Sequence, residues 1–257
     1  MRLDRYLAET GRTSSREKAA ERIRAGAVLV NGKVISKPSA EVSDADEIRI
    51  SENSRYVGRG GYKLEKALSV FPVSVSGKVC LDVGASTGGF TDCMLQHGAA
   101  QVFAVDVGTG QLVSSLRADS RVVSLEKTDI RTLSPFAVDF VCADVSFISL
   151  TYILPALRTF LPEGGDAVVL VKPQFEVGRH RLKNGIVTDR SLQERAIEDV
   201  MCSARASGFS ALGLIPSPIS GGDGNREFLL YLKAGSFVEH ALNIRTVVRS
   251  ATSEKEV

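Results

Sequence analysis

The stretch that decides the fold is Leu81-Asp82-Val83-Gly84-Ala85-Ser86-Thr87-Gly88-Gly89-Phe90, where an apolar run stops at a glycine-rich turn. On both sides of it, short apolar runs alternate with segments of helical periodicity, which is typical of a parallel sheet covered by helices. The runs predict strands at 78–83, 101–105, 121–125, 138–143 and 167–171. We therefore predict an α/β fold in which this turn joins the first strand to the first helix, the place where such sheets admit a ligand.

The glycine-rich turn differs from the dinucleotide-binding pattern. Ser86 stands where G-x-G-x-x-G has its second glycine, and Asp82 lies at the end of the strand. A carboxylate at this place would repel a pyrophosphate, whereas it would attract a sulfonium or ammonium group, and S-adenosylmethionine carries both. The charge pattern therefore favours a Rossmann-like methyltransferase domain with S-adenosylmethionine as its cofactor. The alternative is a turn with a purely structural role.

Two further carboxylates are candidates for contact with the cofactor. Asp106 follows the second predicted strand, about 20 residues after the turn, where an acidic side chain can accept both ribose hydroxyls. Asp129 follows the third strand and would lie at the adenine end. The complete set expected at the cofactor is Asp82, Gly84, Ser86, Gly88, Gly89, Phe90, Asp106 and Asp129.

The segment after the fourth predicted strand indicates the kind of acceptor. It reads Asp144-Val145-Ser146-Phe147, whereas enzymes that methylate exocyclic amines usually have an Asn/Asp-Pro-Pro-aromatic turn there. Methylation at carbon five of cytosine needs a cysteine nucleophile, commonly in a Pro-Cys pair, and all four cysteines of the chain lack that setting. An oxygen acceptor is therefore favoured, and we interpret the cysteines, Cys80, Cys93, Cys142 and Cys202, as reduced core residues.

Charged residues lie near the predicted edge of the sheet where a reaction would occur. Lys172 directly follows the fifth strand, Glu227 begins a final predicted strand, and Lys63 lies near the start of an amphipathic helix. A lysine that is buried beside a second cation can lose its proton near neutral pH and act as a base. We expect Lys172 to be that base. The alternative is that these three residues and Asp144 form two structural salt bridges.

The N-terminal part of the chain differs from the rest in charge and pattern. Residues 1–37 hold nine basic and four acidic side chains, and their periodicity predicts two short helices before a hairpin at Asn31-Gly32. Basic residues on the second helix would form a patch suited to phosphate contacts, although many charge runs are only solvated faces. We predict a small α+β domain at 1–54, a linker at 55–61, a methyltransferase domain at 62–234 and a C-terminal tail at 235–257.

Length and composition fit a two-domain globular protein. The chain has 257 residues, of which 44% are hydrophobic and 24% charged. No apolar run approaches the ~18 residues of a membrane span, and the charged N-terminus lacks the pattern of a secretory signal. The cysteine spacings are not those of a zinc site, so no metal is expected. We expect a cytoplasmic protein with no membrane contact.

The N-terminal pattern resembles the S-four RNA-binding domain over about fifty residues. The similarity is carried by Arg2-Leu3-Asp4, Ser14-Ser15-Arg16, Ile23-Arg24-Ala25-Gly26, Val30-Asn31-Gly32-Lys33 and Lys37-Pro38. In that family the RNA contacts lie on the helical pair and the adjoining hairpin. The resemblance therefore implies RNA contacts at Arg5, Arg16, Lys18, Arg22 and Lys33, to which we add Arg55 and Arg59 of the linker.

The second part of the chain resembles another family. Lys63, Asp144, Lys172 and Glu227, in this order and on these elements, are similar to the catalytic Lys-Asp-Lys-Glu tetrad of the FtsJ-type ribose 2′-O-methyltransferases. Together with the S-four pattern, the segments 59–64 and 171–176 make the chain up to about residue 233 resemble the TlyA family of bacterial rRNA methyltransferases. This resemblance implies 2′-O-methylation of cytidine in ribosomal RNA, with assembled ribosomal subunits as partners.

Two other functions remain open at this point. Members of the same family are also labelled hemolysins, so a membrane-active protein is one alternative, although a membrane-binding segment does not stand out in the sequence. The other alternative keeps the fold without the catalysis and is an RNA-binding ribosome-assembly factor. The complete tetrad favours the enzyme.

Overall fold

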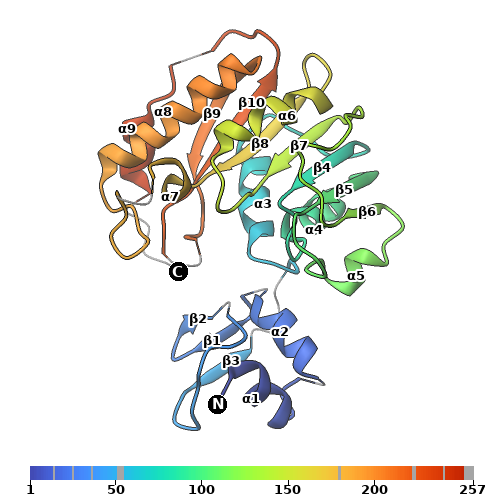
Figure 1. Ribbon diagram of the computed structural model, residues 1–257, viewed down its shortest axis with the longest axis vertical. Helices are drawn as coiled ribbons and strands as arrows, with labels where there is room; N and C mark the ends of the chain where they lie inside the picture. Colours follow the sequence, from blue (N-terminus) through green and yellow to red (C-terminus); the bar gives the residue numbers. More distant parts are fainter. Residues whose placement is uncertain are drawn as a thin grey trace.

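A small N-terminal unit stands apart at one end of the molecule (Figure 1). The computed structural model describes residues 1–13, 15–24, 26–35, 37–50, 55–178, 181–221, 224–239 and 241–251. In the small unit, helices α1 (Leu3–Glu9) and α2 (Arg16–Arg24) precede strands β1 (Val28–Val30), β2 (Lys33–Val34) and β3 (Ile48–Ile50). The strands form an antiparallel sheet in the order β2-β1-β3. Residues 51–54, at the predicted end of the first domain, lie outside the described residues.

The core of the small unit is formed by apolar residues that recur at helical spacing on α1 and α2. Leu3 and Leu7 on α1 and Ile23 on α2 are fully buried against Val28 of β1. On α1, Arg5 and Glu9 lie on the outer face, whereas Asp4 is buried beside Leu3. The predicted hairpin is present at Asn31 and Gly32, which both have positive φ.

The larger unit is built around one sheet, and its strands and helices are named below in the order in which they follow one another along the chain. Its elements are α3 (Gly60–Val70), β4 (Val79–Val83), α4 (Gly89–Gln96), β5 (Gln101–Val105), α5 (Ser114–Arg117), β6 (Val122–Leu125), β7 (Phe140–Ala143), the 3-10 helix η1 (Leu150–Tyr152), α6 (Leu154–Phe160), β8 (Asp166–Val171), α7 (Pro173–Glu176), α8 (Arg190–Ala206), β9 (Phe209–Pro216), β10 (Phe228–Ala234) and α9 (Ile244–Ser250).

The seven strands are hydrogen-bonded in the order β6-β5-β4-β7-β8-β10-β9. Strands β4 to β8 run parallel, and β10 is antiparallel to both of its neighbours. Helices α3, α4 and α5 pack on one face of the sheet, and α6, α8 and α9 pack on the other (Figure 1). Helices cover both faces of the sheet, so the central strands are buried and largely apolar, apart from Asp82 in β4 and Asp166 at the start of β8.

The predicted α/β fold is confirmed, and the five predicted strands correspond to β4, β5, β6, β7 and β8. The final strand begins at Phe228, one residue later than predicted. The predicted tail at 235–257 contains helix α9, whose Val248 is fully buried in the core between α8 and β9. Its residues 252–257 lie outside the described part of the chain. The interpretation of all four cysteines as core residues was wrong for Cys202, which is exposed.

Candidate active site

Four elements deliver the four predicted catalytic residues to one edge of the sheet. Asp144 directly follows β7 and Lys172 directly follows β8, so both lie at the carboxyl ends of parallel strands. Pro173, at the first position of α7, ends β8 at this point because it presets helical φ and lacks an N–H. Strand β10 runs antiparallel to β8, with Phe228 opposite Val171, so its beginning rather than its end brings Glu227 to the same edge.

Helix α3 brings Lys63 to this edge from one face of the sheet. Leu64 and Ala67 are fully buried and fix which side of the helix faces the core. The helix can begin this close to the preceding segment because residue 61 is glycine. A Cβ at Gly61 would lie 2.3 Å from the ring of Tyr56, a distance that no side chain tolerates.

The structure brings all four residues into contact. The Lys63 ammonium donates a hydrogen bond to Glu227 Oε2 at 2.6 Å and lies 3.7 Å from Asp144 Oδ2. The other oxygen of the same carboxylate, Asp144 Oδ1, lies 2.6 Å from Lys172 Nζ. The chain of contacts is thus Glu227, Lys63, Asp144 and Lys172, with one carboxylate between the two lysines. Lys63, Lys172 and Glu227 are at most 7% exposed, so these charges are largely removed from water.

Mutual pairing sets the charges of this group. Burial acts to lower the pKa of Lys63, but Asp144 and Glu227 outweigh it and raise that pKa above its usual value. Burial acts to raise the pKa of Asp144, and the two lysines outweigh it and lower that pKa. Lys63 is therefore a fixed cation. The Asp144 carboxylate lies between the two ammonium groups, with one oxygen toward each lysine.

A cleft of about 480 Å³ opens beside this group, along the carboxyl ends of β4, β5, β6 and β7. Its volume is within the usual range of small-molecule sites. Of the four catalytic candidates, Asp144 lines the cleft, whereas Lys63, Lys172 and Glu227 are not among its lining residues. Five of the predicted site residues line it: Gly84, Ser86, Asp106, Asp129 and Asp144.

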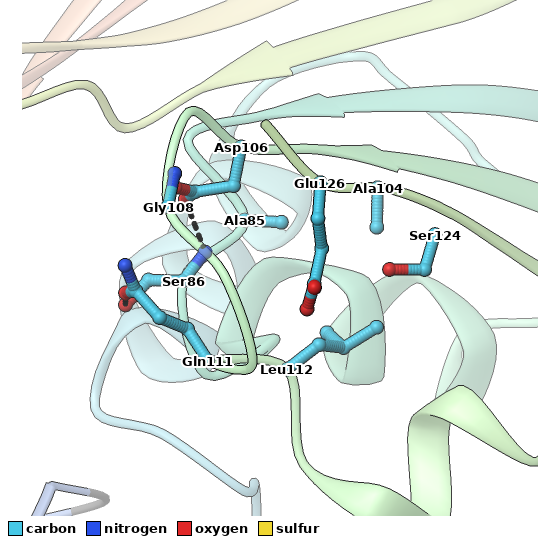
Figure 2. Close-up of a pocket in the computed structure, with 9 residues that line it drawn as sticks. All are labelled: Ala85, Ser86, Ala104, Asp106, Gly108, Gln111, Leu112, Ser124 and Glu126. Atoms are coloured by element: carbon cyan, nitrogen blue, oxygen red, sulfur yellow. Dashed lines mark hydrogen bonds between the residues drawn. The ribbon is translucent and has the colours of Figure 1, made fainter. Parts of the chain in front are cut away.

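Asp106 fixes the loops around one end of the cleft. Its carboxylate accepts the backbone N–H of Ser86 at 2.8 Å and that of Gly108 at 2.7 Å. Figure 2 shows the first of these bonds beside a small pocket of about 10 Å³, which has room for about one water. Glu126 also lines that pocket. The glycine-rich turn and the end of β5 are therefore tied together by one carboxylate, whose remaining lone pairs can accept further hydrogen bonds.

Asp129 lines the same cleft but already has a partner. Its two carboxylate oxygens accept hydrogen bonds from the Arg131 guanidinium, at 2.6 Å for the shortest, and Oδ1 also accepts the Arg131 N–H. Arg131 is itself among the residues that line the cleft. A ligand at this end would meet an ion pair rather than a free carboxylate.

Asp82 does not line the cleft, contrary to the expectation from sequence. Its side chain is fully buried and accepts a hydrogen bond from Thr91 Oγ1 at 2.6 Å. Burial raises the pKa of this carboxyl to about 7. The strand alternates its side chains between faces, and residue 82 points into the helical layer of α4 rather than beyond the strand end. Asp82 therefore ties α4 to β4, and its charge does not face a ligand.

Three other residues of the turn also lie outside the cleft lining. A Cβ at Gly88 would meet Leu112 and Leu116, and one at Gly89 would meet the backbone of residues 58–61. Phe90 is buried and lies against Gly60. Among the glycines of the turn, Gly84 does line the cleft, at φ +82°, and a Cβ there would lie 2.6 Å from the Asp144 carbonyl oxygen. Gly88 and Gly89 thus serve close packing of the loop on its neighbours.

The structure shows an aromatic residue at the cleft that sequence reasoning missed. Phe147 lines the cleft, is 86% exposed and has φ +66°, a conformation unusual for a residue that is not glycine. Its ring lies 5.2 Å from that of Phe175, which in turn lies 5.7 Å from Lys172 Nζ. Its place in the segment that follows Asp144 could have indicated a residue of the site. Hydrophobic periodicity, however, does not distinguish an exposed phenylalanine from one in the core.

Asn225, also missed, fixes the approach to Glu227. Its side chain is buried, accepts the Val187 N–H at 3.0 Å and donates to the Gly185 carbonyl at 2.9 Å. It therefore holds the loop around residues 185–187 beside the start of β10. A buried asparagine three residues before a strand has no sequence signature of its own.

The predicted RNA-contact residues fall into two groups. Lys18, Arg22 and Lys33 are exposed on the small unit. Others already have acidic or backbone partners: Arg5 bonds Glu9, Arg16 pairs with the buried Asp4 at 3.3 Å, Arg55 bonds Glu65, and Arg59 donates to the Ser220 carbonyl at 2.9 Å. The first group is thus the part of the predicted patch whose charge is available to an anionic partner.

The described residues hold neither a metal-ligand cluster nor a membrane-spanning helix. No group of three or more His, Cys, Asp or Glu side chains in this part of the chain could hold a metal ion. Within the same residues, no helix combines the length and the apolar character needed to cross a membrane.

Comparison with known families places this site in context. Residues 56–234 match the model of the FtsJ-like methyltransferases, and residues 1–48 match the S4 domain. The 16S/23S rRNA (cytidine-2′-O)-methyltransferase TlyA of Mycobacterium tuberculosis is 46% identical over 239 residues, which is 90% of this chain and 89% of that protein. The chain belongs to the TlyA family of FtsJ-like methyltransferases.

Other TlyA relatives carry a different name. Hemolysin A of Brachyspira hyodysenteriae is 43% identical over 237 residues, 90% of this chain and 99% of that protein. A solved structure from Streptococcus thermophilus, also described as a hemolysin, is 46% identical with a TM-score of 0.78 and covers 98% of this chain and 95% of its own. The similarity to both relatives thus covers at least 90% of this chain.

Proposed function

We propose that this protein transfers the methyl group of S-adenosylmethionine to the ribose 2′-hydroxyl of a cytidine in ribosomal RNA, within assembled ribosomal subunits. The observation that carries the proposal is the contact chain of Lys63, Asp144, Lys172 and Glu227 at the wall of the cleft. The names of the TlyA relatives support the choice of ribosomal RNA and of cytidine.

The residues of the cleft fit S-adenosylmethionine. A volume of about 480 Å³ accommodates a nucleoside with an amino-acid arm, and Asp106 presents a carboxylate at the end of β5, where ribose hydroxyls can be accepted. The exposed apolar side chain of Val107 lines the same end of the cleft. When bound, the cofactor would supply an electrophilic methyl group. The residues proposed to hold it are Gly84, Ser86, Asp106 and Asp129.

The four buried charges suit an oxygen acceptor. A ribose hydroxyl is a poor nucleophile until its proton is removed or strongly polarised, and Lys172 is the tetrad amine with only one carboxylate against it. Lys63 is held between two carboxylates and keeps its charge, which makes it an electrostatic and positioning group. We assign Lys172 as the base, and Asp144 and Glu227 as the groups that orient the two lysines.

The RNA is proposed to bind first through the small N-terminal unit. Its exposed basic residues suit phosphate contacts, which are insensitive to sequence, so they would position the RNA rather than select the cytidine. Selection would then fall to the cleft, where the exposed ring of Phe147 offers a face on which a base can stack.

The test is methyl transfer from labelled S-adenosylmethionine to ribosomal subunits from cells that lack the gene for this protein. Small subunits, large subunits and naked ribosomal RNA are assayed separately, and the labelled nucleotide is mapped and hydrolysed. We expect 2′-O-methylcytidine in assembled subunits. If none of the three substrates is labelled, the proposed enzymatic activity is refuted. Label on a base would refute the ribose hydroxyl as the acceptor. Lysis of red cells without methyl transfer would favour the hemolysin alternative.

Removing the exposed positive charges of the small unit should weaken RNA binding. We expect the triple substitution of Lys18, Arg22 and Lys33 by alanine to lower the affinity for the subunit by about tenfold or more at moderate salt. The salt dependence should flatten by about one unit of slope for each phosphate that is no longer neutralised. Binding isotherms at several salt concentrations measure both. Arg49→Ala is the matched control, because Arg49 is on the same unit and pairs with Glu47 at 2.6 Å, and an equal loss in this control would contradict the prediction.

Removing the carboxylate at the end of β5 should weaken cofactor binding. We expect Asp106→Ala to raise the Kd for S-adenosylmethionine by about tenfold to a hundredfold, because charged hydrogen bonds to the ribose and the tie to the Ser86 N–H both disappear. Calorimetric titration of the purified protein measures the Kd. Asp119→Ala, which removes a half-buried carboxylate paired with Arg121 away from the cleft, serves as control. An unchanged Kd in Asp106→Ala would place the ribose elsewhere.

A further inference from the structure

The Lys172 amine has a second polar partner besides the tetrad. Its Nζ donates a hydrogen bond to Ser146 Oγ at 2.9 Å and lies 2.6 Å from Asp144 Oδ1. Ser146 is two residues beyond Asp144 on the same loop, lines the cleft and is exposed, whereas Lys172 is only 7% exposed. The serine hydroxyl therefore stands between the buried amine and the open cleft.

The number of acceptors around this amine matters for its role as a base. A neutral primary amine carries two N–H bonds and one lone pair, arranged tetrahedrally with the carbon. Its rotation about the last bond of the side chain is otherwise nearly free. A base delivers catalysis only when its lone pair points at the proton it removes. Some feature of the site must therefore decide which of the three positions on the nitrogen holds the lone pair.

We propose that Ser146 is a positioning residue for methyl transfer, which with Asp144 takes the two N–H bonds of neutral Lys172 and so leaves its lone pair directed at the acceptor hydroxyl. Asp144 Oδ1 can accept one of the two N–H bonds. The other oxygen of this carboxylate, Oδ2, faces Lys63 and is therefore not placed to accept the second N–H bond of Lys172. The ring of Phe175, with its centre 5.7 Å from Nζ, presents no strong acceptor. Ser146 is the acceptor that remains on the cleft side.

This inference rests on the proposed function, in which Lys172 is the base. In the transfer step the acceptor O–H bond breaks and its proton goes to the Lys172 lone pair. The acceptor oxygen forms its bond to the methyl carbon while the bond from that carbon to sulfur breaks, and the electron pair of that bond stays on sulfur. Lys172 then carries three N–H bonds, two of them still accepted by Asp144 and Ser146, and it returns the proton to solvent before the next turnover.

The test compares Ser146→Ala and Ser146→Thr in the full-length protein. Single-turnover methyl transfer to ribosomal subunits is measured together with the Kd for S-adenosylmethionine and for the subunit. We expect Ser146→Ala to lower the single-turnover rate by about tenfold, the effect of removing one hydrogen bond to a charged or reacting group, with both Kd values unchanged. Ser146→Thr keeps the hydroxyl and should restore most of the rate. Ser69→Ala, the same chemical change on the exposed side of α3, should leave the rate unchanged.

Two results would overturn the inference. One is a wild-type rate in Ser146→Ala, and the other is an equal loss of rate in the alanine and threonine variants, since the loss would then not depend on the hydroxyl. Lys172→Ala, assayed in parallel, separates this failure from failure of the proposed function. If Lys172→Ala is inactive while Ser146→Ala is fully active, the assigned base survives and only the role of Ser146 is refuted. If Lys172→Ala is fully active, the proposed base itself is refuted.

Discussion

Replacing Lys172 by alanine is expected to lower the rate of methyl transfer by about 10³-fold, which is within the range that positioned acid–base groups contribute. The reason is that Lys172 is the amine of the tetrad that contacts one carboxylate and faces the cleft through Ser146. Binding of S-adenosylmethionine and of the subunit should change little. Asp144 keeps Lys63 as a partner at 3.7 Å, so the substitution does not leave a buried carboxylate without a cation.

The measurement is single-turnover transfer at saturating cofactor and subunit, with thermal unfolding recorded for each variant. Lys66→Ala is a matched control, since Lys66 is an exposed lysine on α3, one turn from Lys63. A Lys172→Ala rate within tenfold of wild type, in protein that unfolds at the wild-type temperature, would mean that another group removes the proton. A parallel loss of subunit affinity would instead indicate that Lys172 mainly binds RNA.

Asp82→Asn is expected to stabilise the protein at alkaline pH. The folded-state pKa of Asp82 is about 7 against a usual value of 3.8, because burial disfavours the carboxylate. A carboxyl with a raised pKa holds its proton in the folded state, whereas the unfolded chain releases it, so the free energy of unfolding falls as pH rises from about 4 to about 7. At pH 8 the cost is on the order of 4 kcal/mol, and asparagine, which cannot ionise, avoids it.

Chemical denaturation at two pH values isolates this effect from changes in packing. The stability gained by Asp82→Asn should be smaller at pH 5 than at pH 8 by roughly 2–3 kcal/mol. Any loss of the hydrogen bond from Thr91, at 2.6 Å in the wild type, contributes equally at both pH values. Asp44→Asn, at an exposed carboxylate, is the control. A gain that does not depend on pH would mean that the Asp82 carboxyl is ionised at pH 5 in the folded protein.

The sequence predicted the ends of the parallel strands well, because continuous apolar runs stop sharply where a strand leaves the core. Asp106, Asp144 and Lys172 are polar residues placed directly after such runs. In the structure Asp106 and Asp144 line the cleft, and Lys172 contacts Asp144. Asp82 lies inside the apolar run, and the direction of its side chain depends on which face of the sheet residue 82 occupies. The position of a residue in the sequence does not settle that direction for a strand covered on both faces.

Residues that act through distant partners could not be predicted in this way. The hydrogen bonds of Asn225 join segments 38 and 40 positions away. Helix α9 has seven residues, too few for a clear period, and it forms because Val248 packs in the core beside α8. Such features arise from tertiary packing, which local pattern does not encode.

The antiparallel direction of β10 has a consequence for when the protein can first become active. The bond between Lys63 and Glu227 joins positions 164 residues apart, and strand β10 pairs along its length with β8 and β9. A chain still being synthesised can form the N-terminal unit and pair β4 with β5 early, because domains fold as their residues emerge. It cannot close the tetrad until β10 has left the ribosome. A nascent chain could thus hold RNA through its first domain well before it is able to modify that RNA, and every methylation event requires a chain synthesised through β10.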